Sequence, residues 1–371
     1  MVLVEPVSTK KELLDFITYP HQLYKESSCY VPHLIFERKQ FFHPDKNPFF
    51  AHGEVLYFLA RGKGGNILGR ATAHIDRKYL KYHGNQTGFF GFFDSVDDGC
   101  VAAALMEAVE EFHRDRGMER VIGPMNFNTN DEVGVLTRGF DSPPFIMMPY
   151  NYPYYGALLE GRGFAKEKDL YAYYTEYSGF IPRGIERVSA RMKRKTPVRI
   201  RKFDLKHFER ELGVVKKIYN SAWADNWGFI PMDGREIEYL AKNLKPVIDP
   251  SIAFFACLDD EEVGFFIAIP DFNIILKKMG GRLFPFGFLH FFISKKKINR
   301  MRVLVMGVVE QYRHAGVEAV MLEEIYRTAP SAGYPRGELS WILEDNHVMN
   351  RIISRIVSEP YKTYRVYGKE L

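Results

Sequence analysis

The chain has 371 residues, of which 46% are hydrophobic and 15% aromatic, and its formal net charge is +5. This composition excludes an intrinsically disordered protein, and the length predicts two domains that each bury a core. The three cysteines, Cys29, Cys100 and Cys257, lie far apart without a CxxC pair. Their spacing excludes a disulfide framework and a cysteine-based zinc site, and it indicates a reducing compartment.

No signal peptide is visible at the N-terminus, which lacks a basic segment followed by an apolar stretch. The longest apolar run, Leu283–Ile293, contains Pro285 and His290 and is too short to span a bilayer. We therefore expect a cytoplasmic protein, and peripheral attachment to the inner face of the membrane stays open.

Positive charge is concentrated in Arg183–Lys217, which carries thirteen Lys or Arg against four Asp or Glu, a local net charge of +9. Two interpretations stay open: a solvated helix and linker between domains, or a surface that meets phosphates or anionic lipid. No RNA-binding or zinc-finger motif accompanies the block, so we expect no nucleic-acid partner.

The first half of the chain predicts a β-α-β-β-β-α-β unit. A short strand leads into a helix, a hairpin with Gly69 in its second strand follows, and then come a strand, an amphipathic helix and a last strand. In chain order these elements are residues 3–7, 10–17, 55–75, 89–93, 101–112 and 119–124.

The second half repeats the same order. Its hairpin places Gly264 at the position of Gly69, 195 residues later. The corresponding elements are residues 198–203, 205–220, 252–269, 302–309, 317–325 and 337–343, with an insertion within Pro270–Arg300 before the central strand. Gly, Pro and basic residues cluster near Ser178–Pro197 and predict a boundary there. We expect an α/β (α+β) protein of two similar domains, 1–180 and 198–371.

The segment VVEQYRHAGVEAVML, Val308–Leu322, lies at a predicted strand-to-helix junction. It resembles motif A of the acyl-CoA N-acyltransferase (GNAT) superfamily, with Arg313 and Gly316 on motif positions and Glu318 as a departure. The N-terminus of a helix offers free N–H groups and a positive dipole end, which suit the pyrophosphate of coenzyme A. The resemblance covers essentially the full chain and includes phrases such as NWGFIP, FPFG and YKTYRVY.

The chain looks like bacterial tandem-GNAT proteins, and it is similar to lipid-side N-acyltransferases, among them bacterial ceramide synthases. The resemblance implies two mixed, mostly antiparallel sheets flanked by helices, acyl-CoA as co-substrate, an amine acceptor and no metal. It implies cofactor binding in the C-terminal domain by Gly307, Val308, Val309, Arg313, His314, Gly316 and Asn346. The matching junction of the first half has Asp94, Asp97 and Asp98, which would repel phosphate, so we expect no coenzyme A there.

The reaction implied by the resemblance is the attack of an amine on a thioester. Glu344 and Asp345, at the end of a central strand, are the candidate bases. The family's acidic tyrosine is replaced by Ile353, so protonation of the thiolate would pass to Tyr361, Tyr364 or solvent. Two other functions stay open: a non-catalytic pair of GNAT folds that binds acyl-CoA or a partner, and a transferase that uses aminoacyl-tRNA.

The insertion is rich in large apolar residues and ends in Lys295, Lys296 and Lys297. Its apolar members are Leu283, Phe284, Phe286, Phe288, Leu289, Phe291, Phe292 and Ile293. They either fill the core between the domains or receive a long acyl chain or a lipidic amine, with the lysines on anionic head groups.

Overall fold

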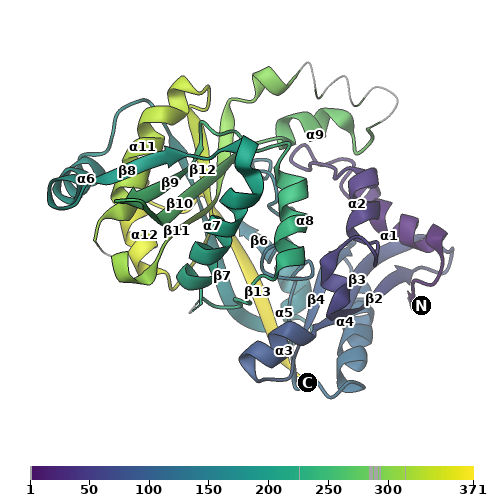
Figure 1. Ribbon diagram of the computed structural model, residues 1–371. Helices are drawn as coiled ribbons and strands as arrows, with labels where there is room; N and C mark the ends of the chain where they lie inside the picture. Colours follow the sequence, from purple (N-terminus) through teal and green to yellow (C-terminus); the bar gives the residue numbers. More distant parts are fainter. Residues whose placement is uncertain (1, 225, 284–286, 288–290, 292–293, 314) are drawn as a thin grey trace. The chain divides into compact units, whose positions relative to one another are not determined.

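The computed structural model describes residues 2–224, 226–283, 287, 291, 294–313 and 315–371. The chain divides into two compact units. Unit 1 consists of Met1–Tyr171, Asn273–Ile293 and Lys362–Leu371, and unit 2 of Ala172–Phe272 and Ser294–Tyr361. Each unit contains a β-sheet with helices beside it (Figure 1).

The sheet of unit 1 has the strand order β1-β2-β3-β4-β5-β13, and β6 also pairs with β13. Neighbouring strands are antiparallel except β4 and β5, which are parallel. The strands are β1 (Leu3–Pro6), β2 (Gly53–Arg61), β3 (Ile67–Asp76), β4 (Thr87–Ser95), β5 (Arg120–Gly123), β6 (Val135–Arg138) and β13 (Lys362–Glu370). The division between the units falls inside β7 (Ala165–Glu176).

The helices of unit 1 begin at residues whose side chains cap them. Thr9 and Glu12 form a capping box on α1, and Asp98 caps α4 by accepting the Cys100 N–H at 2.8 Å. The apolar stripe of α4 is buried against β2 and β3. The helices are α1 (Lys10–Leu23), α2 (Ile35–Phe41), η1 (Pro48–Ala51), α3 (Arg77–His83), α4 (Gly99–Arg114), α5 (Tyr155–Glu160) and α9 (Asn273–Met279).

The sheet of unit 2 contains the order β12-β11-β10-β9-β8, in which only β11 and β12 are parallel. Its strands are β8 (Val198–Lys202), β9 (Ala253–Leu258), β10 (Glu261–Pro270), β11 (Arg300–Val308) and β12 (Arg336–Leu343). Its helices are α6 (Arg183–Lys195), η2 (Leu205–His207), α7 (Phe208–Ala222), α8 (Gly234–Leu244), η3 (Lys295–Lys297), η4 (Glu310–Tyr312), α11 (Val317–Ser331) and α12 (His347–Ser354).

The predicted duplication is present in the structure. The series β1, α1, α2, β2, β3, α3, β4, α4, β5 is matched by β8, α7, α8, β9, β10, α9, β11, α11, β12. In both units the two parallel strands pair over only a few residues, and a β-bulge lies beyond the end of their pairing: at Leu304 in β11, and between Gly91 and Asp94 in β4.

The observed division differs from the contiguous boundaries 1–180 and 198–371 in three segments. The first is residues 172–180, which belong to unit 2. Asn273–Ile293, inside the predicted insertion, belongs to unit 1. The C-terminal strand also belongs to unit 1, where Tyr367 lies opposite Gly123 of β5 and Arg365 opposite Val135 of β6. A strand belongs to the unit whose strands it pairs with, and its position in the chain does not decide which unit that is.

Candidate active site

The parallel strands of unit 2 separate in the middle of the sheet. They pair from Arg300 with Arg336 to Val303 with Leu339, and Leu304 then forms an extra residue opposite β10. Leu304, Val305 and Met306 are part-exposed, whereas the residues on either side of them in β11 are buried. Backbone groups that leave a ladder need another partner, so the bulge of β11 is a place where a ligand carbonyl can be bound.

The equivalent separation in unit 1 is closed by the unit's own residues. β4 and β5 pair only from Thr87 to Phe89 and from Arg120 to Ile122, and every residue of β4 is buried. Beyond that point Asn126 Oδ1 accepts the Phe92 N–H at 2.7 Å. The side-chain amide of Asn126 thus accepts the N–H of the bulge in β4. The corresponding bulge of unit 2 is the part-exposed segment of β11 at Leu304.

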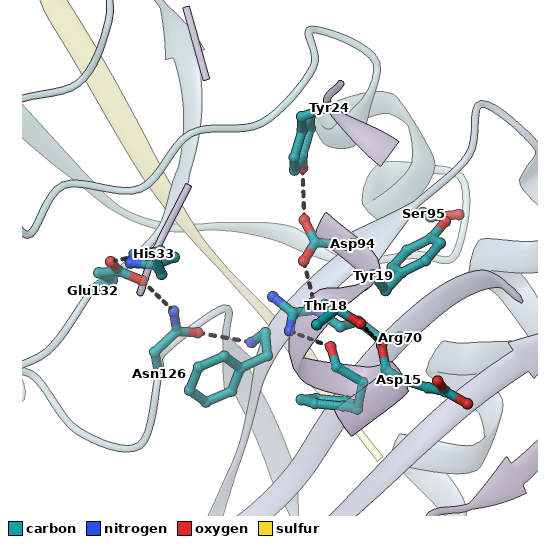
Figure 2. A network of polar contacts seen from close by, with 12 residues as sticks. Asp15, Thr18, Tyr19, Tyr24, His33, Arg70, Asp94, Ser95, Asn126 and Glu132 are labelled. Atoms are coloured by element: carbon teal, nitrogen blue, oxygen red, sulfur yellow. Dashed lines mark hydrogen bonds and ion pairs between the residues drawn. The ribbon is translucent and has the colours of Figure 1, made fainter. Parts of the chain in front are cut away.

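A chain of polar contacts holds that amide in place (Figure 2). Asn126 Nδ2 donates to Glu132 at 2.9 Å. Arg38 Nη2 donates to Nδ1 of His33 at 3.1 Å. Because arginine cannot accept, the neutral His33 ring carries its proton on Nε2, which lies 3.3 Å from Glu132 Oε1. Desolvation and the nearby Arg38 lower the pKa of His33. Desolvation alone would raise the pKa of Glu132, but the charge of Arg38 and the hydrogen bond from Asn126 lower it. Both ring nitrogens of His33 have partners, and the cluster holds Asn126 on the bulge of β4. We therefore assign it a structural role.

The three acidic residues at the first junction have separate roles. Asp94 is buried and accepts from Arg70 Nε at 2.7 Å and from the Tyr24 hydroxyl at 2.6 Å (Figure 2). Asp98 is the cap of α4, and Asp97 is exposed. The buried Arg70–Asp94 pair is an ionic contact inside the unit, which the sequence alone did not predict.

The predicted cofactor turn in unit 2 begins α11 as expected. Gly316 is its N-cap at φ 106°, a conformation that favours glycine, and a Cβ there would lie 3.3 Å from both Val188 and Met192 of α6. Arg313 Nη2 donates to the Ala222 carbonyl at 2.5 Å, at the C-terminus of α7. His314 lies outside the described residues.

The other predicted cofactor residues take different positions around this turn. Gly307 is buried and backs onto Trp223, because an added Cβ would lie 2.3 Å from that ring. Val308 pairs with Gly264, and the Val309 N–H donates to the Val263 carbonyl at 2.9 Å. The backbone groups of Val308 and Val309 are therefore already used in pairing with β10. The groups left to a ligand are the bulge and the first N–H groups of α11.

Glu344, Asp345 and Asn346 follow β12 directly. Asn346 is the N-cap of α12 and accepts the Met349 N–H at 3.1 Å, while Asn350 donates to the carbonyls of Leu343 and Glu344 at 2.9 and 3.2 Å. Both predicted bases thus lie in unit 2 with the turn. Tyr364 instead belongs to β13 in unit 1, fully buried opposite Leu136.

A buried polar cluster that was not predicted from the sequence lies at the point where β11 and β12 separate. We call Arg302, Glu338, Ser340 and Tyr361 the polar tetrad. Arg302 and Glu338 lie opposite each other on the two strands, and Ser340 follows on the same face of β12. The signal in the sequence is the pair of polar residues two apart in GELSWIL, a strand that is otherwise apolar.

The contacts within the polar tetrad converge on the Glu338 carboxylate. Ser340 Oγ donates to it at 2.5 Å, the Tyr361 hydroxyl donates to its other oxygen, and Arg302 Nε donates to Ser340 Oγ at 2.8 Å. Glu338, Arg302 and Ser340 are buried, whereas Tyr361 is part-exposed. A buried carboxylate thus orients an accessible phenol, an arrangement suited to proton transfer.

Two wider features concern the described part of the chain. The His, Cys, Asp and Glu residues there do not form a cluster of three or more able to hold a metal ion. None of its helices combines the length and apolarity needed to cross a bilayer. Lys295–Lys297 form η3 and are exposed, but Phe284, Phe286, Phe288, Leu289, Phe292 and Ile293 of the insertion lie outside the described residues.

Comparison with known proteins identifies close relatives. No family model matches the chain. It is 37% identical over 377 residues to "Bacterial ceramide synthase" of Caulobacter vibrioides, which covers 99% of this chain and 97% of the relative. Protein YghO of Escherichia coli K12 is 33% identical, over 100% of this chain and 95% of its own length.

Solved structures with low sequence identity share the fold. A tandem GNAT protein from the clavulanic acid biosynthesis pathway superimposes with a TM-score of 0.56 at 12% identity, covering 100% of this chain and 98% of that one. A GCN5-related N-acetyltransferase from Sphaerobacter thermophilus gives 0.55 at 12% identity, covering 100% and 95%. The predicted tandem GNAT fold is confirmed.

Proposed function

The chain belongs to the family of tandem-GNAT acyltransferases that includes bacterial ceramide synthase, and we propose that it transfers an acyl group from acyl-CoA to the amine of a long-chain amino alcohol. The relatives support the enzyme class predicted from the sequence, an N-acyltransferase. A lipidic acceptor also fits the proposed peripheral contact with the inner face of a membrane.

The observation that carries the proposal is the contrast between the two strand separations. In unit 2 the bulge of β11 is part-exposed and precedes a glycine-capped helix, whereas in unit 1 Asn126 fills the matching position. We assign the thioester carbonyl to the bulge of β11 and the pyrophosphate to the turn at Gly316. Arg313, which uses one nitrogen on α7, keeps other N–H groups for phosphate, with His314 beside it. Asn346 keeps its NH₂ group for the pantetheine arm.

The proposed chemistry is an addition followed by an elimination. Glu344, or Asp345 beside it, takes a proton from the acceptor ammonium, and the amine then attacks the thioester carbonyl. The bulge N–H groups stabilise the oxyanion. The nitrogen of this intermediate still carries two protons and loses one of them to solvent; the C–S bond then breaks, and the Tyr361 hydroxyl protonates the thiolate. The products are an amide and the free thiol of coenzyme A, and Tyr361 regains its proton from solvent.

Acyl-chain preference tests the proposed substrate class. With a long-chain amino alcohol as acceptor, we expect kcat/KM to be at least tenfold higher for palmitoyl-CoA than for acetyl-CoA, because each buried methylene contributes about 0.8 kcal/mol. The measurement is amide formation by mass spectrometry. Higher kcat/KM for acetyl-CoA would contradict the lipid assignment. Recovery of tRNA from the purified protein would favour the transferase that uses aminoacyl-tRNA, and binding of acyl-CoA without amide formation would favour the non-catalytic pair.

Substitution of Gly316 tests the assigned phosphate site. Gly316→Asp places a carboxylate at the start of α11, and we expect it to weaken coenzyme A binding by about tenfold beyond Gly316→Ala, which shares the backbone strain. Isothermal titration of the full chain measures the difference. The matched control is Gly99→Asp at the start of α4, where a Cβ meets no neighbour and no effect is expected. An equal loss from Gly99→Asp would move the site to unit 1.

A further inference from the structure

Helix α6 has a buried face that fixes it to unit 2. Ile185, Ser189 and Met192 are buried, and Ser189 and Lys193 both donate to Glu323 of α11, the lysine at 2.8 Å. Val188 and Met192 are also the side chains that a Cβ on Gly316 would meet. The apolar side of α6 is therefore already used in packing against α11, next to the proposed cofactor turn.

The opposite face of α6 is a row of arginines. Arg183, Arg187, Arg191 and Arg194 are spaced by four, four and three residues, which places them within about 80° of one another around the helix. All four are exposed, and within the described part of the chain none of them forms an ion pair or side-chain hydrogen bond. Like charges at this spacing destabilise a helix, so the arginine row indicates a polyanionic partner.

An exposed aromatic residue stands at the start of the same helix. Phe180 is 68% exposed and precedes Arg183 by three residues. Arginine binds phosphate groups in a bidentate manner, and an exposed Phe side chain can bury its apolar ring at the boundary between head groups and acyl chains. One flat row of arginines with an apolar residue at its end fits a lipid surface better than a nucleic-acid groove, which would need aromatic residues interleaved with the basic ones.

We propose that the arginine row of α6, together with Phe180, docks the protein on an anionic phospholipid surface. The choice of lipid as the partner rests on the proposed function, because that function assumes a lipidic acceptor. The charge and exposure of the arginine row are observed independently of the proposed function. Docking in this way places α6 between the bilayer and the turn at Gly316, because α6 contacts Gly316 through its other face.

The test is sedimentation of the full chain with vesicles of phosphatidylcholine, with and without 30% phosphatidylglycerol. We expect binding only to the anionic vesicles, and weakening at high salt. A variant with Arg183, Arg187, Arg191 and Arg194 all changed to Gln is expected to lose at least tenfold in partition coefficient, and Phe180→Ala a smaller factor. The matched control changes Lys10, Lys11, Lys46 and Lys63, which are exposed in unit 1, to Gln and removes the same charge.

The outcomes separate docking from catalysis. Thermal melting checks that the variants fold, and acyl transfer in detergent without vesicles checks the enzyme; we expect both to be unchanged in the arginine variant. Equal losses in the arginine and lysine variants, no binding by the natural protein, or tighter binding to RNA than to vesicles would overturn the docking proposal. If the natural protein binds the anionic vesicles but shows no acyl transfer in detergent, that result would count against the acyl-transfer assignment and not against the docking proposal.

Discussion

Replacing Tyr361 by phenylalanine is expected to lower kcat by about 100-fold, because a positioned general acid typically contributes 10² to 10⁴ in rate. The change removes one hydroxyl, which donates to the buried Glu338, and keeps the ring. Substrate binding should change little, since the proton is needed only when the C–S bond breaks. The measurement is kcat and KM for a long-chain acyl-CoA. A thioester of an aromatic thiol, whose thiolate leaves without protonation, should show a smaller loss.

Two other tyrosines supply controls for this prediction. Tyr326 is a buried tyrosine of unit 2 whose hydroxyl contacts that of Thr175 at 2.8 Å. Tyr326→Phe, like Tyr361→Phe, removes one hydrogen-bonded hydroxyl, and it should leave kcat unchanged. Tyr364, the alternative named from the sequence, is fully buried in unit 1. A 100-fold loss in Tyr364→Phe with normal kcat in Tyr361→Phe would return the role to Tyr364.

The order of the elements could be predicted because each half carries its own local signals. The strand-glycine-strand hairpins, the apolar stripe of α4 and the glycine before α11 depend on residues close together in the chain. For the same reason the turn at Gly316 lies at the start of a helix, where the sequence placed it. Local periodicity and capping were sufficient for these features.

The features that sequence reasoning missed depend on contacts between distant residues. Asn126 closes the bulge of β4 at Phe92, 34 residues away, and Arg302 reaches Ser340 across 38 residues. Polar residues in loops or strands look alike in a sequence whether they cap a turn, close a bulge or hold a catalytic group. The placement of β13 in unit 1 is a further case, since strand pairing at an edge has no local signal.

The base is the remaining element of the proposed reaction, and Glu344→Gln is expected to lower kcat by about 100-fold or more. Glutamine keeps the shape of the side chain and cannot take a proton. The backbone at this position is held by Asn350, which donates to the carbonyls of Leu343 and Glu344, so the substitution should not move the end of β12. Binding of acyl-CoA should stay nearly intact, because the assigned cofactor contacts lie on β11, α11 and Asn346.

Two further variants decide whether Glu344 is that base. Glu209→Gln removes one exposed carboxylate from α7 and should leave kcat unchanged. Asp345→Asn should have a smaller effect than Glu344→Gln if Glu344 takes the proton. A base that acts on the acceptor ammonium also predicts that raising the pH partly restores the rate of Glu344→Gln, because more of the free amine is then present. If kcat is unchanged in Glu344→Gln and falls in Asp345→Asn, the base is Asp345. If kcat falls in neither variant, the base that deprotonates the ammonium is a group other than the two carboxylates at the end of β12.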